Sequence, residues 1–158
     1  MTESITEYLN KDLIINNLEA ETTDDIFYAL SKILLKANYV KDSFYGGLVA
    51  RESKFPTGLT LGTYNVAIPH TDAIHVLKPA IAVATLKHPI TFTNMDGDGQ
   101  VDVNVVFCMV LKEPHSQISM LQQLMFLIQN EDVLKSLSKA KDSEELYDIL
   151  TKFDSITN

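Results

Sequence analysis

Histidine is the residue type in this chain best suited to chemistry near neutral pH, because imidazole is the one side chain whose ordinary pKa lies between about 5 and 8. Two of the four histidines follow apolar runs that are typical of strands. His70 comes after residues 66–68 and Pro69, and proline, which lacks an N–H, is expected to end the strand just before it. His115 comes after the apolar run 105–111. A single histidine of this kind is more often structural, but two at strand ends could meet in one site.

Two imidazoles and a guanidinium would suit phosphoryl transfer. One neutral ring nitrogen could attack phosphorus while the other imidazole donates a hydrogen bond to the phosphoryl oxygens. Arg51 is the only arginine, and its planar fork matches phosphate oxygens better than lysine does. A helix is expected soon after His115, and its first amides would add an anion site. The alternative for Arg51 is a surface ion pair with Glu52 or a nearby acid.

The other two histidines and the cysteine are weaker candidates. His75 lies five residues after His70, a spacing that fits neither a helical metal pair at i and i+4 nor a shared face of a strand. We expect His75 to make a supporting hydrogen bond. His88 precedes Pro89 at an expected strand end that should be solvated, and no role is predicted for it. Cys108 is the only cysteine and lies in an apolar run, where burial makes a thiol inert.

The elements that would position these residues are helices at both ends of the chain with strands between them. Apolar patterning predicts strands at 13–18, 66–68, 80–86 and 101–111, and helices beginning at Thr22 or Thr23, at Asp42, near Leu121 and at Ser143. The two longest strands are joined by 94–100, which is typical of a hairpin or of a loop at a sheet end. Terminal helices can cover both faces of such a sheet. The prediction is an α/β fold with a single three-layer domain over 11–158, a mixed β-sheet, and a flexible tail over 1–10.

Composition narrows the function classes. The net charge of −8, from 13 basic and 21 acidic residues without a basic stripe, argues against a nucleic-acid partner and suits a basic protein partner. The N-terminus has no apolar signal segment. The longest apolar run has seven residues, whereas a membrane span needs about 20. We therefore expect a cytoplasmic protein that does not insert into a membrane.

The motifs around Arg51 and His70 resemble a known family. Segment 50–58 reads Ala-Arg-Glu-Ser-Lys-Phe-Pro-Thr-Gly and segment 67–70 reads Ala-Ile-Pro-His. Both are similar to the signature of enzyme IIA domains in the fructose/mannitol superfamily of the sugar phosphotransferase system (PTS), and the likeness covers nearly the whole chain. The resemblance implies a mannitol-type IIA fold and a phosphotransferase component with a phosphohistidine intermediate. It implies that His70 accepts the phosphoryl group, that His115 supports the transfer and that Arg51 binds phosphoryl oxygens.

The same resemblance implies partners and a cycle. The carrier protein HPr, phosphorylated on its own histidine, would give the phosphoryl group to His70. His70 would then pass the group to a cysteine of the cognate enzyme IIB, which works with the membrane component IIC. No metal or soluble cofactor is implied. Segments 55–58 and 70–75 resemble the galactitol-type branch, which implies a role in the transport of galactitol or a related sugar or polyol.

Two other functions compete with this interpretation. A regulatory IIA of the nitrogen-related kind would share the fold and the phosphorylation site but would signal by docking to other proteins. The galactitol-like segments speak against it. A metal-dependent hydrolase would use His70, His75 and His115 together with a carboxylate such as Asp72. No familiar metal-ligand spacing in the sequence supports that function.

Overall fold

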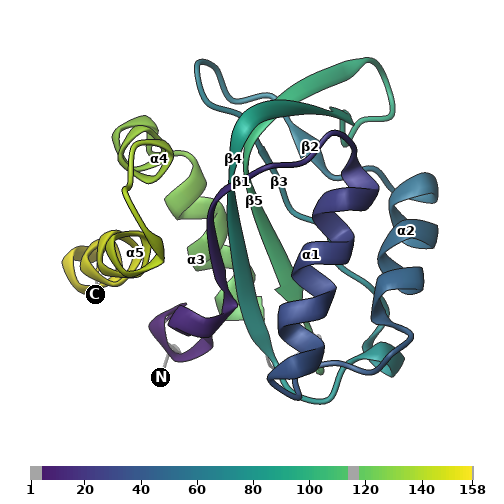
Figure 1. Ribbon diagram of the computed structural model, residues 1–158. Helices are drawn as coiled ribbons and strands as arrows, with labels where there is room; N and C mark the ends of the chain where they lie inside the picture. The colour runs from purple at the N-terminus through teal and green to yellow at the C-terminus, as the bar shows by residue number, and fades with distance from the viewer. Residues whose placement is uncertain (1–4, 114–117, 158) are drawn as a thin grey trace.

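A five-stranded mixed sheet forms the centre of the protein, whose computed structural model describes residues 5–113 and 118–157 (Figure 1). The strands are β1 (Ile14–Leu18), β2 (Gly58–Leu59), β3 (Val66–Ala67), β4 (Ala80–Thr93) and β5 (Gln100–Val110), in the spatial order β1-β4-β5-β3-β2. β1 pairs parallel with β4 and β3 pairs parallel with β5, whereas the β4–β5 and β2–β3 pairs are antiparallel. The predicted mixed sheet is confirmed, and the two longest apolar strands lie inside it.

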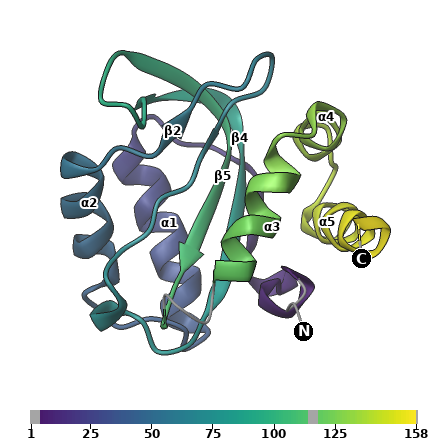
Figure 2. The same ribbon diagram turned by 180° about the vertical axis from the view of Figure 1, so that it is seen from behind.

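Helices cover both faces of this sheet, as Figures 1 and 2 show from opposite sides. One face carries α1 (Thr23–Lys36) and α2 (Phe44–Lys54), and the other carries α3 (Ile118–Ile128), α4 (Glu131–Ser138) and α5 (Ser143–Thr157). Short 3-10 turns form η1 (Ile5–Tyr8), η2 (Lys11–Leu13) and η3 (Ala73–His75). The predicted three-layer α/β architecture is confirmed. Within residues 5–113 and 118–157, no helix is long and apolar enough to span a bilayer.

The inner strands β4 and β5 are buried on both faces over residues 80–85 and 105–110. Ala82 and Cys108 belong to the core on the α1–α2 side, whereas Ile81 and Phe107 belong to the core on the α3–α5 side. Because successive side chains of a strand point to opposite faces, a strand covered on both sides needs apolar residues at nearly every position. Burial raises the pKa of Cys108 to about 12. Its thiol therefore stays protonated, as expected of an inert core residue.

Strand β4 is longer than the sequence predicts. Its pairing with β5 shifts register between Thr85 and Ile90, and Lys87, His88 and Pro89 are exposed there. Proline has no N–H for the ladder, so a strand tolerates it at an irregularity of this kind. The expectation that the strand ends near His88 is therefore wrong, because the bulge lets β4 pass the proline and pair again.

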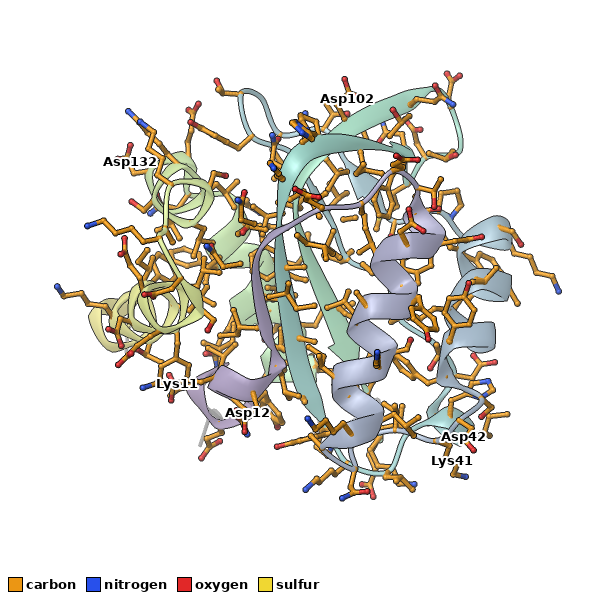
Figure 3. The ribbon with its side chains drawn as sticks, viewed as in Figure 1. Lys11, Asp12, Lys41, Asp42, Asp102 and Asp132 are labelled. Carbon is orange, nitrogen blue, oxygen red and sulfur yellow. The ribbon has the colours of Figure 1, made fainter. Side chains whose placement is uncertain are left out.

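The connection between β4 and β5 is a hairpin, which decides between the two alternatives left by the sequence. Gly97 and Gly99 have φ angles of 80° and 83°, in the left-handed region that glycine adopts at little cost. Figure 3 labels Asp102 near this hairpin, and Lys41 and Asp42 at the opposite end of the molecule. β5 runs from the hairpin toward that opposite end (Figure 1), so its carboxyl end lies on the same side as Lys41 and Asp42.

Helix α1 begins where its capping residues predict. The Thr22 side chain accepts a hydrogen bond from the Asp25 N–H at 3.2 Å, and Asp25 Oδ2 accepts one from the Thr22 N–H at 3.2 Å. This capping box satisfies two of the amides that a helix leaves without partners at its start. The reciprocal hydrogen bonds fix the N-cap at Thr22, one of the two starts that the sequence allows.

The N-terminal residues that the structure describes are packed onto the domain. Ile5, Tyr8 and Leu9 are buried in the core on the α3–α5 side. The Ile5 N–H also donates to Gln123 Oε1 on α3 at 2.9 Å. The described part of the segment predicted as a flexible tail over 1–10 is thus in contact with the core, because its apolar side chains pack against it.

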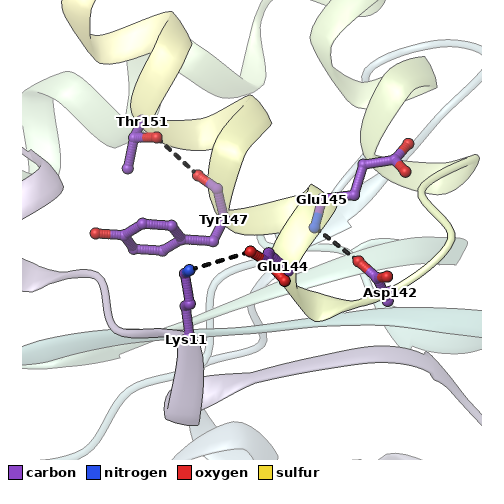
Figure 4. Close-up of polar contacts among 6 residues, drawn as sticks. All are labelled: Lys11, Asp142, Glu144, Glu145, Tyr147 and Thr151. Atoms are coloured by element: carbon purple, nitrogen blue, oxygen red, sulfur yellow. Dashed lines mark hydrogen bonds and ion pairs between the residues drawn. The ribbon is translucent and has the colours of Figure 1, made fainter.

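An ion pair fastens α5 to the N-terminal region (Figure 4). Lys11 Nζ lies 3.5 Å from Glu144 Oε1 and 5.4 Å from the centroid of the Tyr147 ring. Asp142 Oδ1 accepts the Glu145 N–H at 2.8 Å at the start of the helix. Because both charges of the ion pair are well exposed, the pair stabilises the fold by no more than about 1 kcal/mol. Apolar packing therefore supplies most of the docking free energy.

Candidate active site

His70 follows β3 in the chain and lies beside the carboxyl end of β5, to which its backbone is paired. His70 pairs in parallel with Met109, and the Pro69 carbonyl accepts the Met109 N–H at 3.0 Å. Proline lacks an N–H but keeps its carbonyl, so it interrupts the pairing and does not end it. The structure therefore corrects the expectation that the ladder stops before His70. The backbone beneath this imidazole is fixed to an inner strand.

The His70 ring has a defined tautomer in its neutral form. Nδ1 lies 3.1 Å from the Ile68 carbonyl oxygen. A carbonyl oxygen can only accept a hydrogen bond, so the hydrogen of the neutral ring sits on Nδ1. Nε2 then carries the lone pair and is the nitrogen able to act as a nucleophile.

The surroundings favour this neutral form. Burial lowers the pKa of His70 below its ordinary value of 6.5. The hydrogen bond to the Ile68 carbonyl and the negative charge of Asp72 raise the pKa, whereas the positive charge of Arg51 lowers it. Burial is the largest of these influences and sets the net direction. His70 is therefore neutral near pH 7, as a nucleophilic imidazole must be.

The lowered pKa of His70 predicts that this residue makes the folded protein less stable as the pH becomes acidic. Below pH 6.5 the unfolded chain takes up a proton at this residue, whereas the folded protein does not until the pH reaches the lower folded pKa. The free energy of unfolding of the wild-type protein therefore decreases as the pH falls from 6.5 toward the folded pKa of His70. The decrease should be smaller in the His70→Gln variant, which lacks this titrating group. Chemical denaturation of both proteins from about pH 8 to about pH 5 measures the difference. Equal losses, together with an NMR titration midpoint of 6.5 or higher for His70, would contradict the prediction.

Arg51 approaches the same segment from the last turn of α2. Its Nη1 lies 2.8 Å from Asp72 Oδ1, and its guanidinium carbon lies 5.1 Å from the centroid of the Phe55 ring. The Nε–H is buried and has no hydrogen-bond acceptor among the described residues. The sequence left open an ion pair between Arg51 and Glu52 or a nearby acid. The structure shows such a pair, and its acid is Asp72. The ion pair holds the guanidinium against Asp72, which lies two residues after His70 in the chain.

A cavity of about 210 Å³ lies beside Arg51 and Asp72, and His75 forms part of its wall. His75 Nδ1 makes a hydrogen bond with Ser43 Oγ at 2.7 Å, which is the supporting role predicted for it. A Cβ at Gly47 would lie only 2.8 Å from the His75 ring. The glycine in α2 therefore lets the His75 ring pack closely against the helix.

The remaining predicted site residue, His115, lies outside the described residues, in the connection between β5 and α3. His88 is exposed on the β4 bulge. Over residues 5–113 and 118–157 no group of three or more His, Cys, Asp or Glu side chains is arranged to hold a metal ion. The structure thus brings together His70, Arg51 and Asp72, but not the metal-ligand set of a hydrolase within its described part.

Sequence reasoning missed a second polar contact beside Arg51. Glu52 Oε2 accepts the Thr57 N–H at 2.8 Å, and Glu52 Oε1 accepts the Thr57 hydroxyl at 2.8 Å. Burial raises the pKa of Glu52 above its ordinary value of 4.5, while the hydrogen bonds from Thr57 lower it. Glu52 and Thr57 both lie in the signature-like segment 50–58, but the residues alone offered only an acid beside the single arginine with a threonine five residues later. That spacing belongs to no regular periodicity.

A family model described as "Phosphoenolpyruvate-dependent sugar phosphotransferase system, EIIA 2" matches residues 7–153. The chain belongs to this family. As an EIIA 2 protein it is a phosphoryl carrier of a sugar PTS and a phosphotransferase component, which confirms the family that the motifs indicated. The matched region contains Arg51, His70 and His115.

Relatives of this EIIA 2 protein agree with the predicted branch and fold. The galactitol-specific EIIA component of the PTS in Escherichia coli (strain K12) is 31% identical over 120 residues, 76% of this chain and 79% of the relative. A nitrogen regulatory protein of Pseudomonas aeruginosa is 30% identical over 110 residues, 68% of each chain. The complex of enzyme IIAMTL and phosphorylated enzyme IIBMTL from Escherichia coli matches with a TM-score of 0.74 and 20% identity, covering 91% of this chain and 97% of that one. The predicted IIA fold of the mannitol type is confirmed.

Proposed function

We propose that this EIIA 2 protein accepts a phosphoryl group from phospho-HPr on Nε2 of His70 and passes it to a cysteine of its cognate enzyme IIB. The observation that carries the proposal is the hydrogen bond from His70 Nδ1 to the Ile68 carbonyl. This bond leaves the lone pair on Nε2, and burial keeps the ring neutral at physiological pH. The test is whether a phosphoryl group moves from phospho-HPr to His70 and onward to IIB.

Both half-reactions balance with the imidazole alone as the covalent carrier. The Nε2 lone pair attacks phosphorus, the P–N bond to the HPr histidine breaks, and its electron pair returns to the HPr ring. The phosphorylated ring of His70 carries more positive charge, which the Ile68 carbonyl stabilises through the Nδ1 hydrogen bond. In the second half-reaction the thiolate of IIB attacks phosphorus, and the P–N electron pair returns to His70.

Arg51 is proposed to neutralise charge on the travelling phosphoryl group. Phosphoryl transfer is accelerated mainly by in-line positioning and by charge stabilisation. The buried Nε–H of Arg51 lacks an acceptor within the described part of the chain, and a phosphoryl oxygen is an acceptor that suits a guanidinium fork. Asp72 holds the guanidinium through Nη1, so the phosphoryl group and Asp72 would share one cation.

His115 is proposed as the supporting histidine. It follows β5 along the chain, and Met109 in that strand lies beside His70. A hydrogen bond from His115 to His70 or to a phosphoryl oxygen would assist the transfer without a second covalent intermediate.

The proposal predicts that His115→Ala accepts the phosphoryl group from phospho-HPr but transfers it to IIB more slowly, by about 10²-fold. His115→Gln should lie between this variant and the wild-type protein, because an amide keeps a donor but cannot take a proton. Rapid-quench measurement of both half-reactions, with a thermal melt of each variant, tests the prediction. Lowered stability with normal transfer per folded molecule would instead assign His115 a structural role.

The cognate sugar is proposed to be galactitol or a related polyol, because the galactitol-specific relative covers most of both chains. The proposed cycle takes place in the cytoplasm, where IIA would meet HPr and the IIB partner of the membrane component IIC. The acidic net charge of −8 suits a basic surface on a protein partner. Phosphorylation of galactitol by a system reconstituted with this protein would support the assignment, and activity with another sugar alone would exclude it.

A regulatory function is the second candidate, because a nitrogen regulatory protein is also a relative of this chain. The two functions differ in the fate of the phosphoryl group. A sugar carrier passes it to IIB, whereas a regulator keeps it and changes its docking to other proteins. Neighbouring IIB and IIC genes, and transfer to that IIB, favour the carrier.

A further inference from the structure

We propose that Glu52 is a positioning residue that fixes Arg51 and His70 relative to one another. The inference rests on the proposed function of these two residues. Glu52 follows Arg51 directly in α2, and its carboxylate is the acceptor for both the N–H and the hydroxyl of Thr57. One side chain thus ties the helix that carries the guanidinium to the segment that leads into β2.

The same segment is bonded to the backbone before His70. The Thr57 carbonyl accepts the Ile68 N–H at 3.2 Å, and the Ile68 carbonyl accepts the His70 Nδ1–H at 3.1 Å. A continuous chain of hydrogen bonds therefore runs from the Glu52 carboxylate through Thr57 and Ile68 to the imidazole. A displacement of Thr57 would change the position of the carbonyl that selects the His70 tautomer.

The segment after Thr57 has little freedom to compensate. A Cβ at Gly58 would lie 2.6 Å from Val101 Cγ1 and 2.7 Å from the Thr93 carbonyl oxygen. The Met95 N–H donates to the Gly58 carbonyl at 2.7 Å. The backbone is thus pressed against the β4–β5 hairpin on one side, while Glu52 holds it on the other.

The paired hydrogen bonds of the half-buried Glu52 are the reason to assign it a role of this kind. Burial of a carboxylate is unfavourable and raises the pKa of Glu52, whereas a solvent-exposed acid beside Arg51 could have made an ordinary ion pair. Thr57, which supplies both donors, is itself only 3% exposed. The contact is therefore a partly buried link between α2 and the strand pair that leads to His70.

The test compares Glu52→Ala and Glu52→Gln with a matched control in the same connection. The control is Asn65→Ala, because Asn65 Oδ1 accepts the N–H groups of Leu61 and Gly62 but takes no part in the chain to His70. The readouts are the initial rate of phosphorylation by phospho-HPr per folded molecule, the ¹⁵N NMR signals of the His70 ring, and the melting temperature. The ring signals report the tautomer, which a loss of stability alone would not change.

Glu52→Ala is expected to slow phosphorylation by about 10-fold to 100-fold, since small misplacements of reacting groups have effects of this size. The His70 Nδ1 signal should shift toward a mixture of tautomers. Glu52→Gln should stay within a few-fold of the wild-type rate, because an amide can accept from the Thr57 N–H and donate to its hydroxyl. Asn65→Ala should lose stability but keep the rate and the ring signals.

Wild-type rate and ring signals in Glu52→Ala would overturn the proposal, as would equal losses in Glu52→Ala and Asn65→Ala. Should Glu52→Ala fail to fold, Thr57→Val removes one of the two hydrogen bonds and Thr57→Ser restores it, with the same expectations. If the wild-type protein takes up no phosphoryl group, the proposed function fails. The NMR signals of His70 still decide the positioning role in that case.

Discussion

His70→Ala is expected to take up no phosphoryl group when it is incubated with phosphoenolpyruvate and the two general PTS proteins, whereas the wild-type protein takes up one. The substitution removes the nucleophile, and the neighbouring His75 is engaged with Ser43 through Nδ1 and packed against Gly47. Loss of a covalent nucleophile should abolish the reaction and not merely slow it. Intact-mass spectrometry of both proteins measures the outcome.

The chemistry of the label and a matched variant provide the controls. A phosphoramidate on His70 should be labile in acid and stable in base, unlike a phosphoserine. His75→Ala should still be phosphorylated, because His75 serves as a hydrogen-bonding wall of the cavity beside Arg51. A label that maps to His75 or to Ser116 would contradict the assignment of His70.

The sequence was sufficient to predict the layers of the fold because their signals are local. Apolar runs over 80–86 and 101–111 indicated strands covered on both faces, and the glycines of 94–100 indicated the turn between them. The extension of β4 past Pro89 could not be predicted in this way, because it depends on a bulge that only pairing with β5 reveals. The packing of Ile5, Tyr8 and Leu9 onto the domain likewise depends on tertiary contacts, whereas the polar composition of the N-terminal segment suggested a flexible tail.

The principal residues of the candidate site were also accessible to sequence reasoning. Arg51 is the only arginine and His70 follows a predicted strand, so their residue types and the family-like segments around them suggested a joint role. The pairing of Asp72 with Arg51 and the Glu52–Thr57 contact were missed for a physical reason. They act through hydrogen bonds between segments whose relative positions are set by the sheet, and no periodicity in the sequence encodes such a contact.

Arg51→Ala is expected to slow phosphoryl transfer by about 10²- to 10³-fold in each half-reaction, the cost of removing one charge-stabilising group from such a site. Arg51→Lys should recover part of the rate, because it keeps the charge but loses the planar fork and the Nε–H. Stability should change little, since the side chains of the Arg51–Asp72 pair are 33% and 70% exposed and such pairs contribute at most about 1 kcal/mol. Rapid-quench kinetics of phosphorylation by phospho-HPr and of transfer to IIB test the prediction.

Asp72→Asn is the matched control for Arg51, because it removes the negative charge of the 2.8 Å ion pair but keeps the Arg51 side chain. If the guanidinium acts on the phosphoryl group, Asp72→Asn should keep a rate much closer to that of the wild-type protein than Arg51→Ala does. It should also lower the pKa of His70, because a negative charge that raises this pKa is removed. Equal slowing in Asp72→Asn and Arg51→Ala would mean that the ion pair matters as a structural contact. An unaltered rate in Arg51→Ala would remove Arg51 from the site and leave charge stabilisation to the backbone around His70 and to the partner proteins.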